Sequence, residues 1–83
     1  MTTKTTTVKN LTDAQIAGVR AEANDAGDDA MVAVCIVAQE GSISVDDFAA
    51  LDVQAVQAAA KMTREQAYAA VVRAINNAEA QSE

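Results

Sequence analysis

Eight consecutive apolar residues, Met31 to Ala38, constrain this chain more than any other stretch. The run reads Met-Val-Ala-Val-Cys-Ile-Val-Ala, so it has no polar side to turn toward water, and other segments must cover it all round. We therefore expect it to form the middle of the core. A short apolar run fits a buried strand as well as a buried helix, but Asp28 before it and Gln39-Glu40-Gly41 after it are typical helix boundaries and favour a helix.

Each predicted helix begins at a residue whose side chain can accept a hydrogen bond from the first turn. These N-caps are Thr12, Asp28, Ser44, Asp52 and Thr63. Thr12 and Thr63 are each followed three residues later by Gln, which completes a capping box. The predicted helices cover residues 13–26, 29–40, 45–51, 53–61 and 64–79. The break at Asp52 stays open, because residues 45–61 also fit one longer helix.

These elements predict an all-α fold, a compact single-domain bundle of four to five short helices around a buried central helix. With 83 residues, the chain has material for one core only. The predicted helical domain covers residues 11–80, and residues 81–83 are expected to fray. Residues 1–10 contain five threonines and either form a flexible tail or dock as an extended segment.

Charge is distributed unevenly along the chain. The net charge is -6, and no basic residue occurs between Arg20 and Lys61. The acidic residues of that interval are Glu22, Asp25, Asp28, Asp29, Glu40, Asp46, Asp47 and Asp52. Direct nucleic-acid binding is disfavoured, because it requires Lys and Arg to neutralise phosphates. A basic protein surface would instead be attracted.

The residue types that usually carry catalysis are missing or badly placed. Histidine is absent, and Cys35 lies inside the apolar run, whereas a reactive thiolate needs an exposed, electropositive setting. Ser42 and Ser44 have no nearby His or Lys to activate them. Residues 24–29 are rich in Asp but lack the alternating ligands and terminal Glu of a calcium loop. We therefore expect no enzymatic activity, no cofactor and no metal site.

Three features bear on the compartment. The single cysteine rules out an intramolecular disulfide and fits a reducing environment. The longest apolar run is far shorter than the roughly 20 residues that span a bilayer, and the Thr-rich N-terminal segment has no stretch like a signal peptide. The expected location is the cytoplasm, which would be that of the host cell if the protein is phage encoded.

Several segments resemble small acidic helical proteins of phage and bacterial mobile elements. They are Leu11-Thr12-Asp13-Ala14-Gln15-Ile16, Arg20-Ala21-Glu22-Ala23, Ala26-Gly27-Asp28-Asp29-Ala30-Met31-Val32-Ala33-Val34-Cys35, and a closing segment from Thr63-Arg64-Glu65-Gln66-Ala67 to Asn77-Ala78-Glu79-Ala80. Residues 41–61 depart from the pattern. Some proteins of this kind are anti-CRISPR inhibitors, so the resemblance implies binding to a CRISPR–Cas complex without catalysis.

Two functional hypotheses follow. In the first, the chain is a non-enzymatic inhibitor whose acidic surface engages a basic nucleic-acid-binding partner, such as a CRISPR–Cas effector complex, and blocks DNA binding. The candidate contact residues are Asp25, Asp28, Asp29, Asp46, Asp47 and Asp52. Most of them also lie at predicted helix starts, where a negative charge stabilises the helix without a partner.

The second hypothesis is a self-associating structural or adaptor module. The alanine-rich segment 53–60 is thin enough to approach a second helix closely, and two copies of the chain could dimerise through it. A transcription regulator is a weaker alternative, because no predicted helix has a basic face.

Overall fold

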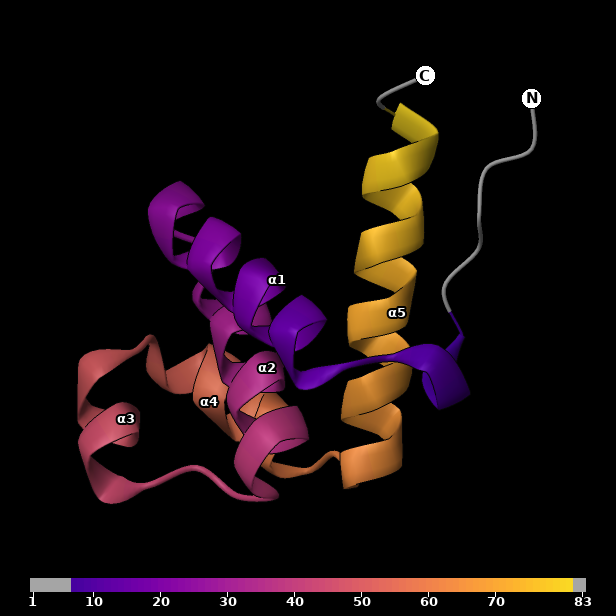
Figure 1. Ribbon diagram of the computed structural model, residues 1–83. Coiled ribbons are helices and arrows are strands. Elements are labelled where there is room, and N and C mark those ends of the chain that lie inside the picture. The colour runs from indigo at the N-terminus through magenta and orange to yellow at the C-terminus, as the bar shows by residue number, and fades with distance from the viewer. Residues whose placement is uncertain (1–6, 82–83) are drawn as a thin grey trace.

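The computed structural model describes the backbone of residues 7–81 and the side chains of residues 7–78. Within this range the chain is a 3-10 turn followed by five α-helices, without a strand (Figure 1). The elements are η1 (Val8–Asn10), α1 (Asp13–Ala26), α2 (Asp29–Glu40), α3 (Val45–Ala50), α4 (Val53–Ala60) and α5 (Arg64–Gln81). The predicted all-α class is confirmed, and none of these helices is both long and apolar enough to cross a membrane.

The ends of α1 and α2 follow from local chemistry. Thr12 Oγ1 accepts the backbone N–H of Gln15 at 3.2 Å, and Gln15 Oε1 accepts the backbone N–H of Thr12 at 2.9 Å, which is the predicted capping box. Gly27 and Gly41 end the two helices with φ of 74° and 81°. This left-handed conformation is unfavourable for residues with a Cβ atom.

The segment after Gly41 forms two helices, so the alternative of one continuous helix is wrong. α3 ends before Leu51, whose backbone is extended. The carboxylate of Asp52 accepts the N–H of Ala55 at 3.2 Å and caps α4. The backbone N–H of Asp52 is also engaged, because it donates to Asp29 Oδ2 at 3.0 Å. Both hydrogen bonds hold the chain out of the helical conformation at the break.

Most of the buried apolar side chains lie on α2 or against it. Residues 32–38 are all buried, while Met31, the first residue of the apolar run, is half-buried. The helices α1, α4 and α5 pack against α2. Their buried residues are Ile16, Ala23, Val56, Ala59, Ala67 and Val71. Cys35 is fully buried, which confirms its predicted place in the core.

The C-terminal end of α2 is held by the first residue of α5. Arg64 donates from Nε to the carbonyl of Ala38 at 3.0 Å and from Nη2 to the carbonyl of Gln39 at 2.9 Å. Its guanidinium also lies over the ring of Tyr68, 5.6 Å from the centroid. The last carbonyls of a helix lack partners within the helix, so Arg64 caps α2 from a distant point in the sequence.

The two chain ends fall partly outside the described residues. The predicted tail covers residues 1–10, of which residues 1–6 are not described, while Val8–Asn10 form η1 and contact α5. At the other end, α5 continues through Gln81, two residues beyond its predicted end. Of the residues expected to fray, 82 and 83 lie outside the described part of the chain.

Candidate functional site

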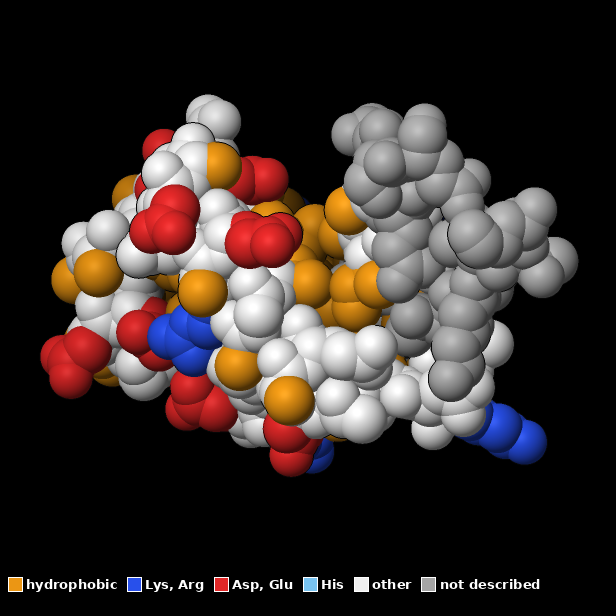
Figure 2. All heavy atoms as spheres, turned by 45° about the horizontal axis from the view of Figure 1, so that its top comes forward, with side chains coloured by type: hydrophobic (Ala, Val, Ile, Leu, Met, Phe, Trp, Pro, Cys, Tyr) orange, Lys and Arg blue, Asp and Glu red, His pale blue; other side chains and the backbone are white. Residues whose placement is uncertain are grey.

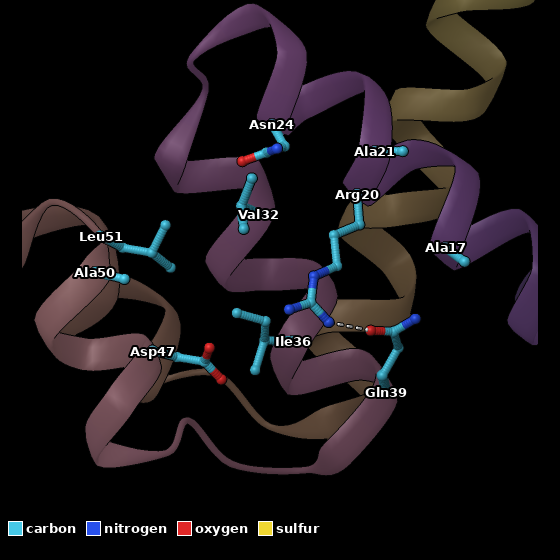
Figure 3. A pocket seen from close by; sticks show the side chains of 10 residues that line it. All are labelled: Ala17, Arg20, Ala21, Asn24, Val32, Ile36, Gln39, Asp47, Ala50 and Leu51. Carbon is cyan, nitrogen blue, oxygen red and sulfur yellow. Dashed lines mark hydrogen bonds between the residues drawn. The ribbon is translucent and has the colours of Figure 1, made fainter.

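A groove of about 480 Å³ lies between α1, α2 and α3 (Figure 3). Its lining residues are Ala17, Arg20, Ala21, Asn24, Val32, Ile36, Gln39, Asp47, Ala50 and Leu51. Val32 and Ile36 form an apolar floor on α2, and polar groups stand on the walls. The groove exists because Ala17, Ala21 and Ala50 have side chains too short to fill the space. Its volume is within the usual range of ligand pockets, about 300–1,000 Å³.

Arg20 is the one basic residue that lines this groove. It is half-buried, and its Nη1 donates to Gln39 Oε1 at 2.8 Å, which links α1 to α2 (Figure 3). Among the described residues no carboxylate lies close enough to form an ion pair with it. The guanidinium therefore keeps N–H donors that no described protein group uses.

Asp47 stands on the opposite wall, on α3 (Figure 3). Its Oδ2 accepts the hydroxyl of Ser44 at 3.0 Å, and its backbone N–H donates to Ser44 Oγ at 3.2 Å. The carboxylate is thus already engaged at the start of α3. The groove combines a guanidinium, two amide side chains and a hydrogen-bonded carboxylate over an apolar floor. Such a set can hold a ligand through hydrogen bonds and apolar contact.

Four of the six aspartates predicted to bind a partner have a role within the fold. Asp28 accepts the N–H of Met31 at 3.2 Å and caps α2. Asp29 and Asp52 are joined by the hydrogen bond at the start of α4, and Asp47 pairs with Ser44. The structure brings Asp29 and Asp52 together from positions far apart in the sequence. Asp28 and Asp52 are still exposed, and Asp29 and Asp47 half-exposed.

The other two aspartates are available on the surface. Asp25 lies near the end of α1 and Asp46 in the first turn of α3, and both are exposed. Neither forms a hydrogen bond or an ion pair with another described residue. They are the members of the predicted set whose charge is free for a partner.

The core cysteine does not line the groove. The pKa of Cys35 is raised from its usual 9.0 to about 11, chiefly by burial; the guanidinium of Arg20 opposes the rise and the carboxylate of Asp28 adds to it. A thiol with so high a pKa is almost entirely protonated at neutral pH. In the described part of the chain, no three Cys, Asp or Glu side chains are grouped so that they could hold a metal ion.

The alanine-rich face predicted for dimerisation is used partly inside the chain. Val56 and Ala59 of α4 are buried, and α4 packs on α2. Ala58 and Ala60 remain exposed, as does Val53 at 52%. The small side chains of this segment therefore allow α4 to pack closely on α2 within the same chain.

The groove around Arg20 was not predicted. Nothing near Arg20 in the sequence indicates Gln39, on the next helix, as its partner. The available signals were the isolation of Arg20 as the last cation before Lys61 and the alanines on both sides of the groove. Comparison with protein-family models, with curated protein sequences and with solved structures gives no match to this chain.

Proposed function

We propose that this chain is a non-enzymatic inhibitor that binds a basic protein through an acidic surface on α1, the start of α2, and α3. The proposal rests on one observation: residues 21–60 contain several exposed carboxylates and no Lys or Arg. Figure 2 shows acidic side chains spread over the half of the molecule that contains α1 and α3. Asp25 and Asp46 support the proposal most directly, since no described residue pairs with them.

Electrostatics favours one class of partner. A protein that binds DNA or RNA presents Lys and Arg to phosphates, and an acidic surface attracts the same side chains. Occupying them would block access of the nucleic acid, which is the basis of inhibition. A CRISPR–Cas effector complex is the specific partner we propose, in keeping with the resemblance to phage and mobile-element proteins. The inhibitor would then act in the cytoplasm of the host cell.

The fold suits such a role. In this proposal α2 is the central helix, and its buried residues 32–38 hold α1 and α4 in fixed positions around it. Carboxylates on helices packed in this way, such as Asp25 on α1, lose little conformational entropy on binding, which favours affinity. The acidic side chains are then presented on helix starts and on α3.

A competition assay tests the proposal. Purified CRISPR–Cas effector complexes of several types are mixed with labelled target DNA, and release of the DNA by this chain is measured at increasing NaCl. We expect inhibition that weakens with salt, because exposed charges are screened. Inhibition that does not depend on salt, or none with any complex, would contradict the proposal.

The chain offers a matched pair of variants for this assay. Asp46 and Glu65 are both acidic residues in the first turn of a helix, both are exposed, and neither pairs with a described residue. Asp46→Asn, alone or with Asp25→Asn, should reduce inhibition several-fold, whereas Glu65→Gln on α5 should leave it unchanged. An equal effect of both changes would mean that net charge alone matters.

A self-associating module is the second candidate. It is favoured by the small apolar side chains that remain exposed on segment 53–60, which are Val53 at 52% exposure, Ala58 and Ala60. Light scattering over a wide range of protein concentration tests it. A mass that stays at that of one chain would exclude self-association.

A further inference from the structure

The short helix α3 turns its apolar side chains outward. Ile43, Val45, Phe48 and Ala49 surround, with Ser44, a hollow of about 350 Å³, and we call this surface the α3 face. Val45 is 85% exposed, and Phe48, the single phenylalanine of the chain, is 42% exposed. Buried aromatic side chains are among the strongest contributors to protein interfaces. Val45 and Phe48 together form an exposed apolar patch beside the hollow, and patches of this kind are typical of contact surfaces.

The packing of α3 explains why this surface is free. None of its six residues is buried, and its main neighbour is α4. In Figure 1, α3 lies at the edge of the molecule away from α5. An isolated helix is marginal below about 12–15 residues, so α3 depends on hydrogen bonds at its ends. Those bonds are the pairing of Ser44 with Asp47 and the anchoring of Asp52 on Asp29.

The charges beside the α3 face select its occupant. Asp46 is exposed next to Val45, and Asp47 and Asp52 also lie on or just after the helix. Residues 21–60 contain no cation, and Arg20 lies across the groove on the side of Asp47. A second copy of the chain would bring Asp46 and its neighbours against like charges, which is unfavourable. A basic amphipathic segment satisfies both the apolar surface and the carboxylates.

We propose that the α3 face docks an amphipathic helix of the partner protein, one that carries an apolar stripe flanked by Lys or Arg. The apolar stripe covers Val45 and Phe48, and its basic flanks reach Asp46. This mode of recognition lays the apolar face of one helix on an apolar surface of another protein. The inference rests on the proposed function for the charge of the partner, and it adds the apolar anchor that charge alone does not supply.

A pair of designed peptides tests the two parts separately. Each is a helical peptide of about 18 residues with Leu at i, i+3, i+4 and i+7; one has Lys at the flanking positions and the other has Glu. Binding to the isotope-labelled full chain is followed by amide chemical shifts. The Lys peptide should shift residues 43–49 in a saturable manner, and the Glu peptide should not bind.

Variants of the chain locate the contact. Val45→Ser is the main variant, because a residue 85% exposed can be changed with little effect on folding. It should weaken the Lys peptide about fivefold or more, and Phe48→Ser should do so at least as strongly. Val8→Ser on η1 is the control, since Val8 is also exposed, at 46%, but lies outside the α3 face.

The outcomes separate this inference from the proposed function. If the Lys peptide binds on the acidic surface but Val45→Ser and Phe48→Ser have no effect, the α3 face is excluded while the acidic surface stands. If the Glu peptide binds the α3 face as well as the Lys peptide, the charge premise fails for both proposals. Shifts confined to the α1 and α2 residues of the groove around Arg20, or dimerisation through the α3 face, would overturn the inference.

Discussion

The carboxylate of Asp29 accepts the backbone N–H of Asp52, with an Oδ2–N distance of 3.0 Å. This hydrogen bond joins the first turn of α2 to the residue that caps α4. Asp52 then uses its own carboxylate to accept the N–H of Ala55. Two acidic residues that the charge pattern assigns to a partner thus also determine where the chain breaks between α3 and α4.

Removing the Asp29 carboxylate should therefore destabilise the fold. Asp29→Ala leaves the N–H of Asp52 without its protein partner, and we expect a loss of about 1 kcal/mol in the free energy of unfolding. Asp25→Ala is the control, because Asp25 is exposed and pairs with no described residue; its effect should stay within about 0.5 kcal/mol. Urea unfolding followed by circular dichroism measures both. Equal values would mean that the Asp29 bond contributes nothing.

Replacing two of the glycines by alanine should change the stability of the fold in opposite directions. Gly27→Ala places a Cβ on a residue with φ of 74°, where strain costs about 1 kcal/mol although no neighbouring atom is in the way. Gly18 lies inside α1 and also has open space around the position of a Cβ. Gly18→Ala should therefore stabilise the protein by about 0.5–1 kcal/mol. Thermal unfolding should show a lower melting temperature for the first variant and a higher one for the second.

The buried thiol predicts how stability depends on pH. Cys35 has a pKa of about 11 in the folded chain against 9.0 when exposed, so between these values the folded state holds the proton more tightly. The protonated thiol makes its full contribution to the free energy of unfolding below pH 9. This contribution is lost as pH rises toward 11, at up to about 1.4 kcal/mol per pH unit. Unfolding of the native chain and of Cys35→Ala across this range measures the difference. The variant should lack this part of the slope.

Arg20 links the groove to this thiol. Arg20→Met keeps most of the side-chain volume but removes the hydrogen bond to Gln39, and we expect a loss of about 1 kcal/mol. It also removes the cation that lowers the Cys35 pKa in the folded chain, so the alkaline loss of stability should begin near pH 9 as before but extend to higher pH and become larger. Arg73→Met, at an exposed position on α5, should change neither quantity. An unchanged alkaline profile in Arg20→Met would show that the two groups are not coupled.

The helix boundaries could be predicted because they depend on neighbouring residues. Thr12 and Gln15 cap each other across three residues, and Gly27 supplies the left-handed end of α1 within the same stretch. Such interactions are readable from spacing alone. The burial of Cys35 was predictable for a similar reason, since both of its neighbours, Val34 and Ile36, are apolar.

The groove and the α3 face could not be predicted in this way. Arg20 and Gln39 are 19 residues apart, and Arg64 and Ala38 are 26 apart. Spacing within a helix gives no information on contacts of this range. The outward position of Phe48 could not be predicted either, because a large apolar residue is ordinarily buried. For the predicted aspartates, position in the sequence indicates the capping roles alone. The hydrogen bond between Asp29 and Asp52 can be seen only in the tertiary structure.

The capping of α2 by Arg64 affects how the chain can fold during synthesis. The carbonyls of Ala38 and Gln39 find their donors on a residue translated well after α2 itself. Until Arg64 leaves the ribosome, the last carbonyls of α2 lack their hydrogen-bond donors. The surface of α2 that α5 covers with Val71 is also exposed at that stage. Folding should therefore be completed late in translation or after release, and chains that stop before residue 64 should be substrates for proteases rather than stable domains.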